Sequence, residues 1–115
     1  MITIIAIGNG GYNIARDISD AKLFDSVSLL VCDTDTANLS KHSECADGSL
    51  LLQAEEDFIQ RNNVKIVETL NNINTDEIII TSSLNEYIGQ HFTYPIAYAA
   101  SLLEKTVAII STLTF

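Results

Sequence analysis

The sequence predicts an α/β domain in which helices cover both faces of a parallel β-sheet, a three-layer doubly wound arrangement. Two observations carry this prediction. Apolar, β-branched runs continue without the alternation of a half-exposed strand, which is typical of strands buried on both faces. Segments with helical spacing of apolar residues separate these runs. The runs cover residues 2–7, 27–32, 77–81 and 106–111.

The expected helices follow from the residues between the runs. The stretch 36–52 is predicted to hold a short helix around 37–42 and then a turn at 47–49. Pro95 is expected to open the last helix, where its missing N–H has no cost. The resulting order predicts about four parallel strands in a Rossmann-like sheet and one domain over residues 1–115. The apolar positions of the longer helices are Ile14, Ala15, Ile18 and Ala21; Ala54, Phe58, Val67 and Leu70, with Asn62 and Asn63 as an interruption; and Ile96, Ala99, Ala100 and Leu103.

Charge and composition limit the classes of partner. The chain has a formal net charge of −9 and only six Lys and Arg residues. This argues against a nucleic-acid surface, because duplex binding depends on cations that neutralise phosphates. No apolar run approaches the roughly 20 residues of a membrane span, and none resembles a targeting segment. Cys32 and Cys45 lack metal-ligand spacing and indicate reduced thiols, so we expect a cytoplasmic protein. Cys32 is expected to be buried at the end of a strand.

A glycine turn, Gly8-Asn9-Gly10-Gly11, joins the first strand to the first helix. Glycines at this place let the backbone approach a phosphate, and the helix N-terminus attracts negative charge. The turn is not a P-loop, since no Gly-Lys-Ser/Thr follows, and Asn13 holds the place of the third glycine in a dinucleotide fingerprint. It is either part of a nucleotide site or a tight turn that binds nothing.

Further candidate site residues follow the second and third strands. Asp33 lies where a Rossmann acid meets ribose hydroxyls, and Asp35 is either a second contact or the cap of the next helix. Ser82 and Ser83 would line the same crevice, because they follow a parallel strand. No metal site and no catalytic constellation is predicted. His91 is read as an exposed or packing residue and His42 as a solvated one.

The segments resemble the N-terminal part of the nucleotide-binding domain of the FtsZ/tubulin family. Residues 4–13 look like its first strand and glycine loop, and residues 33–39 are close to the Asn-Thr-Asp-Ala-x-x-Leu segment of FtsZ. Residues 95–115 resemble a proline-started helix and the next strand. The resemblance implies a GTP- or GDP-binding protein of the cell-division type, with Gly8, Gly10, Gly11, Asn13, Asp33 and Asp35 as candidate contacts.

The chain also departs from that family. Where the family carries a Gly-Gly-Gly-Thr-Gly-Thr-Gly phosphate loop, this chain has Glu86, Tyr87, His91 and Phe92, with Gly89 alone remaining. The family's later segments, which complete hydrolysis, find no counterpart here. We therefore expect at most weak GTP or GDP binding and no enzymatic activity; the residues themselves require no cofactor.

Three other functions stay open. The domain could be an interaction module that meets a family partner or forms a homodimer through residues 83–94, with Tyr87, Phe92 and Tyr94 as anchors. It could bind a dinucleotide such as NAD, with Asp33 on a ribose. A phosphorelay receiver fits Thr81 and Lys105, but the acidic residues expected after the first strand are missing.

Overall fold

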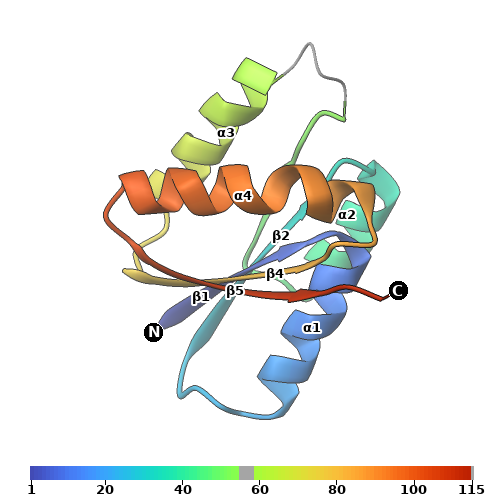
Figure 1. Ribbon diagram of the computed structural model, residues 1–115. Helices are drawn as coiled ribbons and strands as arrows, with labels where there is room; N and C mark the ends of the chain where they lie inside the picture. The colour runs from blue at the N-terminus through green and yellow to red at the C-terminus, as the bar shows by residue number, and fades with distance from the viewer. Residues whose placement is uncertain (55–58, 115) are drawn as a thin grey trace.

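The computed structural model describes residues 1–54 and 59–114, which form an α/β fold around one sheet (Figure 1). Within these residues, five parallel strands lie in the order β3-β2-β1-β4-β5. This confirms the predicted Rossmann-like α/β class. The strands are β1 (Ile2–Ile7), β2 (Val27–Asp33), β3 (Gly48–Leu51), β4 (Glu77–Ser83) and β5 (Thr106–Thr112).

Helices cover both faces of this sheet (Figure 1). On one face, α1 (Gly8–Asp20) and α2 (Thr36–Ser43) enclose a cluster that contains Ile4 and Ile79. On the other, α3 (Ile59–Asn71) and α4 (Tyr87–Leu102) enclose a cluster that contains Ile5 and Ile80. Because successive residues of a strand point to opposite faces, a strand between two helical layers needs apolar residues throughout. This explains the unbroken runs of the sequence.

The strand β3 was not predicted, since the sequence reads as a turn at 47–49. The segment instead pairs in parallel with residues 30–33 of β2. Leu50 and Leu52 are buried in the core, and the Asp47 carboxylate accepts a hydrogen bond from the Leu29 N–H at 2.8 Å. The burial of the two leucines and the hydrogen bond from Leu29 to Asp47 outweigh the turn preference of the residues at 47–49. The predicted number of strands was therefore one too low.

The prediction that Pro95 opens the last helix was wrong, because α4 begins at Tyr87 and contains Pro95 in its interior. In the interior of a helix, a proline removes one hydrogen bond, the one to the carbonyl four residues earlier, and its ring crowds that carbonyl. Burial of Ile88 and Phe92 in the two preceding turns favours the longer helix. Thr93 adds a side-chain bond, since its hydroxyl donates to the Gly89 carbonyl at 2.6 Å.

Helix α3 continues through Asn62, where an interruption was expected. The Asn62 side chain is buried, and it bonds both the N–H and the carbonyl of Gln53 at 2.8 Å. The side-chain amide pairs with the backbone of Gln53 as a neighbouring strand would. It therefore holds this residue, which precedes the helix, against α3. The residue is therefore a structural anchor.

The buried face of α3 also differs from the prediction. Ile66 and Leu70 reach the core, whereas Val67 is 39% exposed. Ala54 is exposed and precedes the helix, and Phe58 lies outside the described residues. In α1, Ala15 is buried and Ile14 and Ile18 are half-buried, but Ala21 is an exposed residue just beyond the helix end.

The two thiols lie in different surroundings. Cys32 is buried in β2, as predicted, and Cys45 is exposed. Desolvation, reinforced by the neighbouring Asp33 carboxylate, raises the pKa of Cys32 to about 12. This thiol is therefore protonated and unreactive in the folded state. In the described part of the chain, no helix has the length and apolar character that crossing a membrane requires.

Candidate functional site

The candidate site lies where the strand order reverses, between β1 and β4 (Figure 1). From β1 the chain moves toward β2 and β3, and from β4 it moves toward β5. In open α/β sheets, ligands bind at this switch point, outside the carboxyl ends of the strands. The glycine turn at 8–11 and the loop at 84–86 meet there. Gly8 has a φ of +69°, which favours glycine.

The N-terminus of α1 is occupied by a carboxylate from the chain itself. The Gly10 N–H donates a hydrogen bond to Glu86 Oε1 at 2.6 Å, across 76 residues of sequence. The residue before the helix, Ile7, offers no side-chain cap. Helix N-termini attract anions because their N–H groups are free and the helix dipole is positive there. Glu86 therefore takes the place in which a bound phosphate would be expected.

The turn also packs closely against β4 and the loop after it. A Cβ atom added to Gly10 would lie 2.4 Å from Ser83 Cβ and 2.6 Å from Glu86 Oε1. A Cβ added to Gly11 would lie 2.3 Å from the Thr81 carbonyl oxygen. The protein's own packing thus requires these glycines, whether or not the turn holds a ligand.

The two candidate aspartates bond to nearby backbone groups. Asp33 is buried, and its Oδ1 accepts hydrogen bonds from the N–H groups of Thr34 at 2.8 Å and Asp35 at 3.0 Å. Asp35 caps α2 through the N–H groups of Ala37 and Asn38. The capping alternative for Asp35 is therefore confirmed.

The remaining candidate residues separate into three groups. Ser82 is fully buried, and its hydroxyl oxygen lies within hydrogen-bond distance of two others, those of Ser111 at 2.8 Å and Thr93 at 2.9 Å. It belongs to the interior beside α4. Ser83 lies at the glycine turn and accepts a hydrogen bond from the Asn85 N–H at 3.3 Å. Asn9 and Asn13 are exposed. The structure thus gathers Gly8, Gly10, Ser83 and Glu86.

His42 lies beside the residue that follows the glycine turn, a position that the sequence did not predict. It was read as solvated, but its side chain is only 7% exposed. Its ring stacks on Tyr12 with 4.0 Å between the ring centroids. Burial lowers the pKa of His42; Lys41 acts in the same direction, and Asp33 and Glu86 act against it. Tyr12, the aromatic residue directly after the glycine turn, was a signal that a ring packs here. Nothing in the sequence indicated that His42 is its partner.

We expect the stability of the protein to depend on pH through His42. Because the folded-state pKa is lowered, the folded protein resists protonation. This stabilisation is complete above about pH 6.5, the ordinary value, and is lost as the pH falls toward the folded-state pKa. The substitution His42→Phe keeps a ring on Tyr12 but removes the titration. In urea denaturation from about pH 8 to about pH 5, the variant should lose less stability than the wild type. Parallel profiles would contradict this role.

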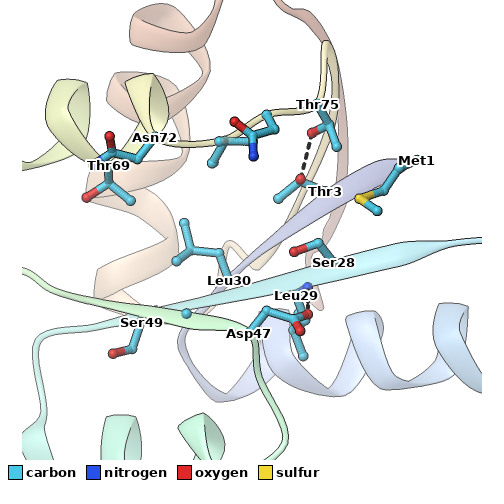
Figure 2. A pocket seen from close by; sticks show the side chains of 13 residues that line it. Met1, Thr3, Ser28, Leu29, Leu30, Asp47, Ser49, Thr69, Asn72 and Thr75 are labelled. Carbon is cyan, nitrogen blue, oxygen red and sulfur yellow. Dashed lines mark hydrogen bonds between the residues drawn. The ribbon is translucent and has the colours of Figure 1, made fainter.

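A hollow lies at the opposite, amino ends of the strands (Figure 2). It has a volume of about 460 Å³. Some of its polar side chains have internal partners: the Thr3 hydroxyl bonds the Thr75 hydroxyl at 2.6 Å, and the Asp47 carboxylate accepts from the Leu29 N–H. Of the described residues that line it, Asp47 alone has a charged side chain. Across residues 1–54 and 59–114, no group of three or more His, Cys, Asp or Glu side chains is arranged to hold a metal ion.

Comparison of the sequence with protein-family models and with curated proteins finds no match. The five-stranded parallel α/β fold is thus established by the structure, whereas membership of a family and function are matters for proposal.

Proposed function

We propose that this chain is a divergent FtsZ/tubulin-like domain that acts as a non-catalytic interaction module. Its phosphate-binding turn is occupied by its own Glu86 and keeps at most weak affinity for GTP or GDP. The observation that carries this proposal is the hydrogen bond of 2.6 Å from the Gly10 N–H to the Glu86 carboxylate.

Electrostatics explain why a nucleotide would bind weakly. A phosphate that approached the Gly10 N–H would meet the Glu86 carboxylate, and two like charges about 4 Å apart repel by about 4 kcal/mol near a protein surface. The Arg16 guanidinium, on the same helix as the turn, bonds the Tyr12 hydroxyl. Lys105 lies at the opposite, amino ends of the strands, where its ammonium bonds the carbonyls of Ile73 and Thr75. Glu86 must therefore move before a phosphate can use the turn.

The order of the elements supports the family part of the proposal. The glycine turn lies at the switch point, and the 33–39 segment follows β2. These are the segments that carry the resemblance to FtsZ. The residues that replace the family's glycine-rich loop form the start of α4, with Glu86 directly before it. A helix with bulky side chains in this place supports a non-catalytic role.

Exposed aromatic side chains support the interaction module. The outer face of α4 presents Tyr94 and Tyr98, which are 71% and 52% exposed and whose rings stack with 5.9 Å between the centroids. Tyrosine is a favoured anchor at protein interfaces. Leu102 and Tyr87 extend this surface, which we name the α4 stripe: Tyr87, Tyr94, Tyr98 and Leu102. Phe92 was expected to be an anchor of the segment 83–94, but this residue is buried against the core and cannot serve as an anchor.

The substitution Glu86→Ala tests the occupied turn. It removes a charge-assisted hydrogen bond and a favourable helix-dipole contact, so we expect a loss of about 1–2 kcal/mol in unfolding free energy. It also frees the Gly10 N–H and removes the repulsion. Calorimetry with GTP and GDP should show binding at least about tenfold tighter than to the wild type.

Two further variants make this test specific. Glu86→Gln removes the charge but keeps an acceptor, and we expect it to gain part of the affinity. Glu68→Ala removes one negative charge on the exposed side of α3 and should change neither property. If Glu86→Ala leaves GTP and GDP binding undetectable, the nucleotide part of the proposal is wrong. A rise in melting temperature with NAD, and not with GTP, would favour the dinucleotide alternative.

A further inference from the structure

Strand β5 forms an edge of the sheet and is largely uncovered (Figure 1). It pairs with β4 on one side. In the part of the chain that the structure describes, no strand pairs with its other side. Ile109 is 50% exposed and Ile110 is 42% exposed, and these two side chains point to opposite faces of the sheet. The strand therefore presents an open backbone edge and apolar side chains on both faces.

The free hydrogen-bonding groups of this edge can be assigned. The Thr106 N–H donates to the Asp76 carbonyl, and the Thr112 carbonyl accepts from the Leu84 N–H, both at 2.8 Å. Peptide groups of alternate residues point to the same side of a strand. The backbone N–H and carbonyl groups of Thr106 and Thr112 point toward β4. Those of the alternate residues, Val107, Ile109 and Ser111, therefore point away from the sheet.

Within residues 1–54 and 59–114, this edge lacks the usual protection. Natural edge strands are blunted by lysine, proline, bulges or covering segments. Residues 106–114 contain no charged residue and no proline, although the whole chain has a net charge of −9. The chain is also held in place beyond the last strand residue, because the Asn85 side chain bonds both the N–H and the carbonyl of Thr114 at 2.8 Å.

We propose that a second copy of this chain pairs with β5 in antiparallel orientation about a two-fold axis at Ile109. In this register Val107 lies opposite the partner's Ser111, and Ile109 lies opposite the partner's Ile109. These are the residues with outward peptide groups, so each opposed pair exchanges two hydrogen bonds. Their side chains share one face, and the partner's Ile110 covers Ala108 on the other. The two five-stranded sheets join into one.

Charge favours a second copy over a partner of another kind. An acidic or basic partner strand would find no countercharge on residues 106–114. A neutral, apolar strand matches this edge, and β5 itself has that chemistry. Two copies with a net charge of −9 repel at long range, so added salt should strengthen the pairing rather than weaken it. A single strand pair is smaller than a standard interface, which predicts a dissociation constant of about 1–100 µM.

This pairing gives the interaction module of the proposed function its first partner, and in that sense it rests on the proposed function. The experiment measures sedimentation equilibrium from about 2 µM to about 400 µM at low and moderate salt. The wild type should pass from monomer to dimer, with tighter association at the higher salt. Ile109→Lys places two like charges opposite each other at the axis and should weaken dimerisation at least about tenfold. Val64→Lys, a matched charge on the exposed side of α3, should leave it unchanged.

A second variant and a residue-specific readout guard against simple misfolding. Ile109→Pro removes an N–H that points away from the sheet, which an edge strand tolerates, and it should also abolish the dimer. Hydrogen exchange should show the amides of Val107, Ile109 and Ser111 protected at high concentration only. The amides of Ala108 and Ile110, which point toward β4, should be protected throughout.

The pairing is overturned by a monomer at every concentration, or by a dimer that leaves the Ile109 amide unprotected. A dimer that survives Ile109→Pro but is lost in Tyr94→Ala or Tyr98→Ala would overturn β5 pairing while supporting the α4 stripe. Failure of this inference and failure of the proposed function are therefore distinguishable.

Discussion

Replacement of Gly89 with alanine is expected to destabilise the protein by about 3 kcal/mol or more. A Cβ atom at this position would lie 2.0 Å from the Ser83 carbonyl oxygen and 2.9 Å from its carbonyl carbon. These are backbone atoms at the end of β4, so no side-chain rotation relieves the overlap. Alanine favours a helix over glycine by only about 1 kcal/mol, so the clash dominates.

Gly48→Ala is the matched control for this substitution. Its added Cβ would lie 3.2 Å from Leu30 Cδ1, the flexible end of a side chain. We expect a change within about 1 kcal/mol, because the leucine can give way. Urea denaturation of both variants measures the difference. Equal stabilities would show that the loop between β4 and α4 can shift away from Gly89, and that the close approach is not a constraint.

The sheet was predictable because a strand that is buried on both faces requires an unbroken apolar run in the sequence. Residues 2–7 and 77–81 are apolar or β-branched at nearly every position, which few other environments require. The strand β3 has no such run, since only Leu50 and Leu52 of this segment reach the core and turn-forming residues precede them. The predicted helix start at Pro95 was wrong for a related reason. The preference of proline for a helix start is local, whereas the burial of Phe92 that extends α4 is tertiary.

The candidate site was predictable only in part. The glycine turn lies at the switch point, as its position after the first strand indicated. Its contact with Glu86 spans 76 residues, and no local pattern specifies such a pair. The direction of Ser82 depends on the register of β4, which places it inside beside α4 and leaves Ser83 at the turn. The stacking of His42 on Tyr12 likewise depends on how α2 lies against α1.

The buried position of Phe92 leads to a second large effect. This side chain is 9% exposed and packs in the cluster with Ile88 and Ile96, between α4 and the sheet. Phe92→Ala leaves a cavity and removes apolar burial, for which we expect a loss of about 3–4 kcal/mol. That loss is a large fraction of the about 5–15 kcal/mol that stabilises a domain of this size.

Tyr94→Ala, two residues away on the same helix, is the matched control. Its side chain is 71% exposed, so the stability should change by less than about 0.5 kcal/mol. The two variants also separate packing from association, when urea denaturation is read beside sedimentation. Phe92→Ala should lower stability in dilute monomer, where no partner contributes. A Phe92→Ala variant with unchanged stability but altered association would contradict its place in the core and return it to the set of interface anchors.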